Sequence, residues 1–567
     1  MKFKLFATAS AAAIVLSASA ALAGDNNSAF IDQIGTANNA AITQTGTDNR
    51  AGQNTANGRI RQEGDENDLD IVQDSAGTTQ GGRAGLGNAG IDQIGNRNVL
   101  SITQDRGAVY NVQQTSTGAA GAIADVANRA TVTQGLSATN QVARIEQTYT
   151  GDGTSGTENV VSVTQTTSGT GTTGNRLSDG GINSQTGGIF QNGFSNSATV
   201  NQSGAFNETS FVMQDGSGHS ASVSQTRTGN SVQTIDQDGT NQSATIVQIG
   251  VAGIFSSANQ VDLVQQSGDA NVANLSFTGN LNGNPGFLPL ATDFANSVAS
   301  SFESSVIQAG TNNGVDLIVV GDSNQFGFNQ SGDNNTVGMV SFTGDGNEIG
   351  VDQQGGDNEL GLSAIVGSNN DIGVKQTSDA AGNGNLATVN TSGSGTSDNN
   401  AVRVVQDSQG APSGNDANVF FDGNSNTVDI AQTGDNDADV DVVGSSNAFA
   451  VAQNGLSNSA TVDITGDSNG LTGGGPLTGD AAGVSGVTVG LINQFGDSNT
   501  ANLTISDTLS DSSGDNNLFA FDQAGNGNSI TGTQDGDSNQ VAIAQNGNAN
   551  GATFLQQGTF NNLGISQ

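Results

Sequence analysis

Polar and apolar side chains alternate along this chain in a unit of 11 residues. Near the C-terminus an Asn is followed two residues later by a small or apolar residue, then usually by an apolar one, and six residues later by Gln. Side chains at positions i, i+2, i+4 and i+6 lie on one face of a β-strand. The unit N-x-A-x-I/V-x-Q therefore predicts a strand that buries one face. The clearest run of Gln residues, 11 residues apart, is Gln523, Gln534, Gln545, Gln556 and Gln567.

The residues after each Gln predict a turn. The pattern x-G-x-x-N places Gly, which takes positive φ without strain, and Asn, which tolerates it, between two strands. A single strand cannot bury its face, so two units facing each other make one coil of a solenoid. We expect an all-β fold, a β-solenoid of two-strand coils with 21–23 residues per coil. The predicted turn glycines are Gly35, Gly46, Gly95, Gly525, Gly536 and Gly547.

In the middle of the chain, an apolar residue replaces every second Gln. Phe342 and Ile365 stand between Gln330, Gln353 and Gln376. We predict that one strand of each coil stacks Gln on Gln there and that the other stacks apolar on apolar. Because equivalent residues of stacked coils lie about 4.8 Å apart, their amides can bond in continuous ladders.

This substitution of Gln by apolar residues indicates that the position faces inward. The alternative is that the amides face solvent and only keep the strands soluble. Further copies of the unit include Asn196 to Gln202 and Asn259 to Gln265. The residues predicted to form the ladders are Gln33, Gln44, Gln93, Gln104, Gln330, Gln353, Gln376, Gln523, Gln534, Gln545, Gln556, Asn38, Asn98, Asn528, Asn539 and Asn550.

Stretches rich in Gly, Ser and Thr interrupt the repeat and divide the chain. We expect them to protrude as loops from coil corners or to separate blocks of the solenoid. Lys2 and Lys4 precede an apolar run and the small residues up to Ala23, which predicts an export signal. The expected parts are a signal peptide at 1–23, a repeat region at 24–279, a Pro-containing insert at 280–300, a region with alternating Gln and apolar units at 301–469, a Gly-rich insert at 470–487 and a C-terminal repeat region at 488–567.

Composition narrows the class of protein. The formal net charge of −39 argues against binding to nucleic acid or to anionic lipid, both of which need a basic surface. The chain has no Cys, so no disulfide framework supports it. No stretch is long and apolar enough to predict a transmembrane helix. Only 33% of the residues are hydrophobic, which alone would suit disorder, but the regular repeat argues for a folded chain.

Residues for catalysis or metal binding are sparse. His219 is the only histidine and lies in a turn-like context, so a catalytic triad or a His-ligated metal centre would depend on it alone. Asp435, Asp437, Asp439 and Asp441 alternate as in a Ca²⁺-binding loop, but the Gly and Glu that such a loop requires are missing. In a strand these four acids would share one face. We therefore expect no catalytic residues, no cofactor and no defined metal site.

The unit resembles the curlin repeat of bacterial curli fibres, whose pattern is Gln-x-Gly-x-x-Asn-x-Ala-x-x-x-Gln. Residues Gln33 to Gln44 match it at Gly35, Asn38 and Ala40. Residues 93–104 match with Leu100 in place of the Ala. The chain departs from the family in having many more repeats, alternating apolar units and long inserts, and the repeat begins without a preceding pore-targeting segment.

The resemblance implies a functional amyloid on the outer surface of bacteria. Its subunits leave through a dedicated outer-membrane secretion pore, polymerise from a nucleator subunit, and form fibres for cell adhesion and biofilm matrix. By that resemblance we expect a secreted, non-enzymatic structural subunit that stacks end to end with itself at the cell surface. Gln567 is in register with its row and no capping segment follows it, which favours such stacking.

Two other functions stay open from the sequence. One is a monomeric extracellular β-solenoid adhesin that binds a glycan or a host ligand through its loop inserts. The other is an extracellular solenoid enzyme that acts on a polysaccharide with a pair of carboxylates. No spacing of acids singles out such a pair.

Overall fold

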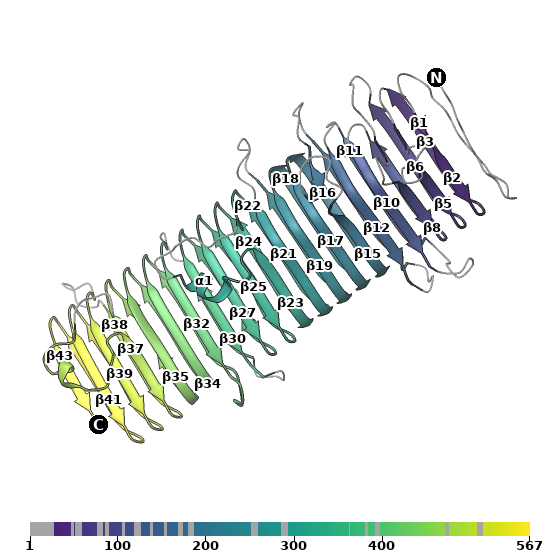
Figure 1. Ribbon diagram of the computed structural model, residues 1–567. Coiled ribbons are helices and arrows are strands. Elements are labelled where there is room, and N and C mark those ends of the chain that lie inside the picture. Colours follow the sequence, from purple (N-terminus) through teal and green to yellow (C-terminus); the bar gives the residue numbers. More distant parts are fainter. Residues whose placement is uncertain are drawn as a thin grey trace. The chain divides into compact units, whose positions relative to one another are not determined.

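The computed structural model describes residues 28–46, 50–51, 59–75, 83–84, 90–104, 108–117, 126–135, 140–151, 156–167, 174–179, 186–250, 259–284, 293–361, 363–379, 384–391, 397–470, 476–506 and 514–567. The predicted signal peptide, Pro285 and Pro289 lie outside the described residues. The chain divides into two units, Met1–Leu281 (unit one) and Asn282–Gln567 (unit two). In each unit the strands pair in parallel with strands one coil further along the chain, which forms two stacks of strands (Figure 1).

In unit one, both stacks are built mainly from strands of four to ten residues. The first stack contains β1 (Ser28–Ala29), β2 (Ile31–Ile34), β4 (Arg50–Ala51), β5 (Ile60–Glu63), β7 (Arg83–Ala84), β8 (Ile91–Ile94), β10 (Ala108–Ser116), β12 (Gln141–Tyr149), β14 (Arg176–Leu177), β15 (Gly188–Phe194), β17 (Glu208–Ser217), β19 (Ser231–Thr240) and β21 (Gln260–Asp269). The second contains β3 (Asn39–Gly46), β6 (Asp68–Ser75), β9 (Asn98–Gln104), β11 (Asn128–Gly135), β13 (Asn159–Thr166), β16 (Ser197–Ala205), β18 (Ser220–Thr228), β20 (Ser243–Ile249) and β22 (Val272–Thr278).

In unit two, β34 (Thr427–Val443) and β35 (Ala448–Thr461) run through a coil corner and contribute to both stacks. The first stack also contains β23 (Ser305–Thr311), β25 (Gln325–Ser331), β27 (Glu348–Gln354), β30 (Asp371–Thr377), β32 (Ala401–Asp407), β37 (Leu491–Phe495), β39 (Leu518–Ala524), β41 (Gln540–Asn546) and β43 (Asn562–Ser566). The second contains β24 (Gly314–Val320), β26 (Thr336–Thr343), β28 (Glu359–Leu360), β29 (Ser363–Val366), β31 (Leu386–Asn390), β33 (Asp416–Asp422), β36 (Ile464–Thr465), β38 (Thr500–Ser506), β40 (Ser529–Asp535) and β42 (Gly551–Gln557).

The strands bury the four positions that the repeat predicts. In β11, Asn128, Ala130, Val132 and Gln134 are at most 1% exposed, and the residues between them are half-buried. Equivalent ladder residues in uninterrupted coils are 21 to 23 residues apart. These observations confirm the all-β fold and the β-solenoid of two-strand coils.

The apolar column predicted for the middle of the chain is present in unit two. Val319, Phe342 and Ile365 occupy equivalent positions of successive coils and are at most 1% exposed. The opposite stack carries Gln330 and Gln353 at its equivalent positions. Each coil in this region therefore has one strand that contributes an amide and one that contributes an apolar side chain.

The turn glycines are required by the stacking itself. Gly525 has a φ of +117°, and a Cβ atom there would lie 2.0 Å from the carbonyl oxygen of Gly547 in the next coil. A side chain would therefore force two coils apart. The sequence predicted that the Asn would be the second residue of the turn with positive φ. The structure instead places positive φ at the residue before the Asn, such as Ala37 (φ 55°) or Ser538 (φ 58°). The Asn instead points its side chain into the corner, where it makes hydrogen bonds.

Part of the predicted Pro-containing insert is a helix rather than a protruding loop. Helix α1 (Phe294–Ala299) packs on the outer face of β25, β27 and β30 (Figure 1). The buried carboxylate of Asp371 in β30 accepts the backbone N–H groups of Phe294 and Ala295, both at 2.7 Å. Asp293, the residue at the N-cap position, makes no side-chain hydrogen bond to the helix. The Asp371 carboxylate, from another element, therefore serves as the cap of α1.

A column of glycines makes room for α1. Gly327, Gly350 and Gly373 occupy equivalent outward positions in β25, β27 and β30. A Cβ atom on Gly350 would lie 2.4 Å from the carbonyl oxygen of Ala295. The sequence contained this signal, because a Gly stands at the same outward position of three successive units.

The described part of the predicted Gly-rich insert also packs on a strand stack. The 3-10 helix η1 (Ala481–Gly483) places Ala481 against Ala520 and Ala542. The side chain of Asn562 accepts the N–H of Ala481 at 2.6 Å and donates to the carbonyl of Thr478 at 2.6 Å. This segment therefore covers one outer face of β39, β41 and β43, whereas the expectation was a protruding loop or a break between blocks of the solenoid.

Replacing Gly350 with Ala tests the packing of α1. The added methyl group would meet the Ala295 carbonyl, and overpacking of this kind costs about 1–3 kcal/mol. We expect a lower guanidinium midpoint for Gly350→Ala, measured by circular dichroism. Gly314→Ala is the control, because nothing lies within 4 Å of the added atom. Equal midpoints for the two variants would contradict the packing of α1.

Candidate functional site

Buried Gln side chains of successive coils form hydrogen-bonded ladders. In unit two, Gln330 Nε2 donates to Gln353 Oε1, and Gln353 Nε2 donates to Gln376 Oε1, both at 2.8 Å. The second amide proton of Gln353 goes across the coil to the carbonyl of Thr336 at 3.1 Å. Both protons of the buried amide are therefore used, which removes the cost of burying it.

The same geometry holds for the other predicted Gln residues. The donor is always the residue nearer the N-terminus and the acceptor is its counterpart in the next coil. The bonds run from Gln33 to Gln62, Gln62 to Gln93, Gln44 to Gln73, Gln73 to Gln104, Gln104 to Gln134, Gln523 to Gln545, Gln534 to Gln556 and Gln545 to Gln567. Gln534 Oε1 makes no hydrogen bond, because the preceding member of its column is Ile505.

A second ladder is formed by Asn side chains at the corners. The Oδ1 atom of Asn67 accepts both the backbone N–H and the side-chain amide of Asn98, each at 3.0 Å. Its Nδ2 atom donates to the carbonyl of Gly95 at 2.8 Å. Asn38 makes the same contacts with Asn67 and Gly64. Each Asn thus joins its own coil to the next one at the point where the strand pairing stops.

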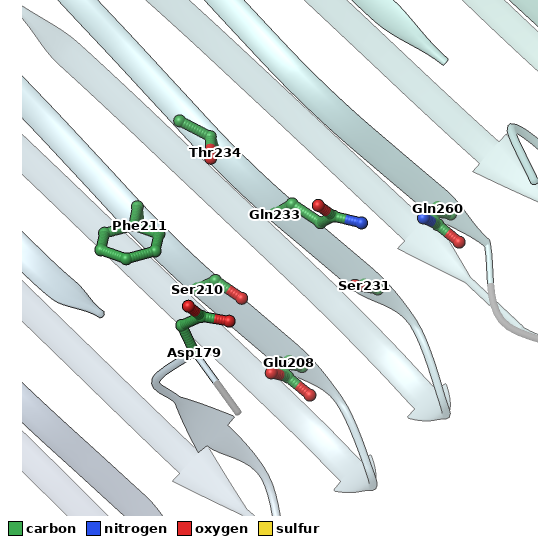
Figure 2. Close-up of a pocket in the computed structure, with 8 residues that line it drawn as sticks. All are labelled: Asp179, Glu208, Ser210, Phe211, Ser231, Gln233, Thr234 and Gln260. Atoms are coloured by element: carbon green, nitrogen blue, oxygen red, sulfur yellow. The ribbon is translucent and has the colours of Figure 1, made fainter. Parts of the chain in front are cut away.

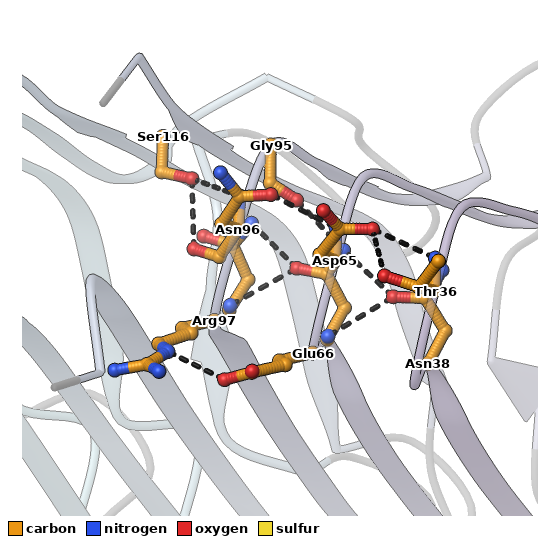
Figure 3. Close-up of polar contacts among 10 residues, drawn as sticks. Thr36, Asn38, Asp65, Glu66, Gly95, Asn96, Arg97 and Ser116 are labelled. Atoms are coloured by element: carbon orange, nitrogen blue, oxygen red, sulfur yellow. Dashed lines mark hydrogen bonds and ion pairs between the residues drawn. The ribbon is translucent and has the colours of Figure 1, made fainter. Parts of the chain in front are cut away.

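The outer side of the turn carries a third set of bonds (Figure 3). The backbone N–H of Thr36 donates to Asp65 Oδ1 at 2.7 Å, and the N–H of Asp65 donates to Asn96 Oδ1 at 2.9 Å. Arg97 Nε donates to Glu66 Oε2 at 2.6 Å. The Thr36 hydroxyl and N–H lower the pKa of the Asp65 carboxyl. Turn acids therefore accept N–H groups from the preceding coil, a role beyond solubility.

The predicted turn glycines have the φ values that these corners need. Gly35, Gly95, Gly525, Gly536 and Gly547 have φ between +91° and +128°. Gly46 is the last residue of β3. The remaining predicted Asn residues, Asn528, Asn539 and Asn550, occupy the corner row and each donates its backbone N–H to the Asn of the preceding coil.

His219 occupies a position in the corner row of Asn residues. It is 1% exposed, its N–H donates to Asn196 Oδ1 at 3.1 Å, and its Nε2 lies 3.0 Å from the carbonyl oxygen of Asp215. Burial lowers its pKa. The spacing could have shown this, because His219 stands six residues before Gln225, as an Asn does in other units.

One predicted unit has a shifted register. Gln266, not Gln265, joins the ladder in β21 and accepts from Gln237 Nε2 at 2.8 Å. Gln265 is exposed on the outer face. The cause is an extra residue between Val261 and Val264, so that seven residues rather than six separate the corner Asn from its Gln.

The ladder ends with an unpaired amide at the last described coil. Asn528 Nδ2 donates to the Gly547 carbonyl at 2.9 Å, and Asn539 Nδ2 donates to the Gly558 carbonyl at 2.9 Å. Asn550 Nδ2 is buried but has no hydrogen-bond partner. In the described part of the chain, β42 pairs only with β40 and β43 only with β41. A Cβ atom on Gly547 would meet nothing closer than 3.6 Å, unlike Gly525.

The alternating acids divide between a corner and one outer face. Asp435 lies at the corner before Asn436, whereas Asp437, Asp439 and Asp441 face outward from β34. The prediction that all four acids share one face is therefore wrong, because β34 runs through a turn between Asp435 and Asp437. Among the described residues, no group of three or more His, Asp or Glu side chains is placed to hold a metal ion.

Burial, with a further contribution from repulsion, raises the pKa of four acids in this region. Desolvation raises the pKa of Asp416, Asp437, Asp441 and Asp463, and the charge of Asp439 raises each of them further. A carboxyl whose pKa is raised by folding favours the folded state when protonated. Its contribution is therefore full below the unfolded value near 3.8 and is lost as the pH rises through the folded value.

Removing one ladder amide should destabilise unit two. In Gln353→Leu, the Gln376 Oε1 atom and one Gln330 amide proton lose their partners, at about 1–3 kcal/mol for each buried group. Gln354→Leu is the matched control, because its exposed amide bonds only Asp352, at 2.9 Å. Denaturant unfolding should separate the two variants, and equal free energies of unfolding would show that the ladder adds no stability.

The raised pKa values of Asp416, Asp437, Asp441 and Asp463 should make unit two more stable as the pH falls from 7 toward 4.5. Asp439→Asn removes the shared charge and should raise the unfolding temperature at pH 7, with a smaller gain at pH 4.5 because the neighbouring acids are then more protonated. Asp429→Asn should instead lower it, because Asp429 pairs with Arg403. Calorimetry at both pH values checks this, and a pH-independent effect of Asp439→Asn would contradict it.

Comparison with known proteins agrees with the repeat geometry. The model of the family described as Curlin associated repeat matches residues 24–52 and 183–226. The second match includes β15, β16, β17 and most of β18, where Gln191, Gln202, Gln214 and Gln225 lie in the ladders. Curated proteins give no match. Curlin repeats define a structural family rather than an enzyme family, and the two matched segments support a protein that carries curlin repeats.

Proposed function

We propose that the protein is a secreted structural subunit of a curli-type surface fibre, formed by copies that stack end to end. The observation that carries this proposal is the buried Asn550 Nδ2 atom without a partner. In the preceding coils, the equivalent atom donates to a Gly carbonyl of the next coil. An unpaired buried donor costs about 1–3 kcal/mol, and the carbonyl of an added coil would remove that cost.

The two ends of the ladders have complementary chemistry. At the last coil, Gln556 Nε2 donates only across its own coil, to Gln540, and its bond toward a further coil is unmade. At the first described coil, β2 and β3 pair on one side only, with β5 and β6. We infer that β2 of a second copy adds to β43 in the first stack and that its β3 adds on the side of β42 in the second, so that the backbone and Gln ladders continue with the same polarity. Such head-to-tail contacts do not close and generate filaments.

The curlin-repeat matches support a place outside the cell. Curlin repeats imply an extracellular surface fibre, and within the described residues no helix is both long and apolar enough to cross a membrane. We propose export through an outer-membrane pore, addition to a nucleator subunit, and a role in adhesion and biofilm matrix. The net charge of −39 keeps unassembled copies apart, and salt would screen it. No enzymatic role forms part of the proposal.

Seeded assembly of residues 24–567 tests the function. We expect seeds to remove the lag in thioflavin fluorescence, and fibre diffraction to give reflections near ~4.7 Å and ~10 Å. A β-rich monomer that does not grow from seeds would overturn the fibre proposal and favour the monomeric adhesin.

The variant Asn550→Asp tests whether a second copy adds at the coil that contains Asn550. The change should leave monomer stability nearly unaltered, because Nδ2 has no partner in the chain, but it places a carboxylate against the incoming carbonyl and should slow seeded elongation at least tenfold. Asn548→Asp is the matched control in the same turn. At that turn position an acid can follow an acid in the next coil, because the backbone N–H of Asp467 donates to the carboxylate of Asp515. The Asn548→Asp variant should therefore elongate normally. Normal elongation of Asn550→Asp would contradict this route.

A further inference from the structure

A groove on the outer face of unit one lies over three strands that each carry a bulge, and β10 and β12 carry the same bulge outside the groove. Strands β17, β19 and β21 each have one residue more between the corner row and the Gln than most strands have. Thr209 pairs with Val232 and Phe211 pairs with Thr234, so the residue between them in each strand is left out of the pairing. The extra residues turn neighbouring side chains outward, as bulges do beside binding sites.

These side chains line this open groove, which has a volume of about 460 Å³ (Figure 2). That volume lies within the roughly 300–1,000 Å³ of small-molecule sites. One side is the row Glu208, Ser231 and Gln260, and the other is the row Phe211 and Thr234. The lining residues are Asp179, Glu208, Ser210, Phe211, Ser231, Gln233, Thr234 and Gln260.

The groove has one aromatic wall that is held in position. The ring of Phe211 stacks on that of Phe190, with centroids 6.4 Å apart and planes 24° apart. The guanidinium of Arg144 lies 5.2 Å from the centroid of Phe190 on this face. This stack fixes the orientation of the Phe211 ring without using a ladder residue.

The other lining groups are hydrogen-bonding and uncharged or acidic. Two carboxylates accept bonds, and three hydroxyls and two amides both donate and accept them. Arg176 lies 3.9 Å from Glu208 and partly offsets its charge. No basic side chain is among the lining residues, so an anionic ligand would be repelled.

We propose that this groove binds a neutral polysaccharide. The C–H face of one sugar ring packs on Phe211, and its hydroxyl groups bond to Glu208, Asp179 and the amides of Gln233 and Gln260. The rows repeat at the strand spacing of about 4.8 Å, so a chain of sugars can cross successive strands. The site lies on the sheet face, not on the loop inserts, and does not depend on the stacking of copies.

Affinity electrophoresis of the unassembled chain tests the proposal, with dextran, soluble starch or mixed-linkage β-glucan in native gels and dextran sulfate as the anionic probe. We expect at least one neutral polysaccharide to retard the protein and dextran sulfate not to. Phe211→Ala and Glu208→Gln should weaken that binding at least tenfold. Phe495→Ala, which removes a 60% exposed ring in unit two, should leave it unchanged.

A second variant distinguishes loss of binding from misfolding of Phe211→Ala. The chain has no Trp, so Phe211→Trp keeps an aromatic wall and places the only indole in the groove. We expect its emission to shift on titration with the polysaccharide that retards the wild type, and Phe495→Trp to show no shift. Lack of retardation by every neutral probe, stronger retardation by dextran sulfate, or unchanged binding of Phe211→Ala would overturn the proposal. None of these results bears on seeded fibre growth.

Discussion

The hydrogen bond between equivalent amides of successive coils is the interaction on which the rest of this structure depends. A buried amide is tolerated only when its donors and acceptors are paired. Here the partner of most buried Gln and Asn side chains is the same residue type one coil further along, as in Gln330 and Gln353. Every coil must therefore keep the length and the register of the coil before it. Additional residues can be accommodated only outside the stacked positions, as inserts between strands or as bulges within them.

The same constraint explains why a chain with few hydrophobic residues can fold. Apolar columns such as Val319, Phe342 and Ile365 supply dry contacts, and the ladders make a polar interior acceptable beside them. Because all Gln bonds run in one direction, the two ends of a stack differ in their chemistry. In the last described coil, the corner amide of Asn550 lacks the Gly carbonyl to which Asn528 and Asn539 donate.

The outer faces are not bound by this constraint, and they carry what differs along the chain. Glycines at the outer positions of β25, β27 and β30 accommodate α1, whereas bulges in β17, β19 and β21 open a groove beside Phe211. Acids at the outer positions of β33 and β34 repel one another. Stacking and any additional binding are therefore separate properties of the same strands.

The sequence by itself determined the strand period, the two-strand coil, the inward row of Asn and Gln and the turn glycines. All of these follow from alternation and spacing within one or two units, because each coil repeats local geometry. Even the place of His219 could be obtained from its distance to Gln225. Only the tertiary structure decided that Gln266 replaces Gln265 in the ladder, that Asp371 caps α1 from 77 residues away, and that Phe211 and Glu208 share a groove with Asp179. These features depend on contacts between segments far apart in the chain, and alternation along one strand carries no information about which neighbour a bulge or an insert will meet.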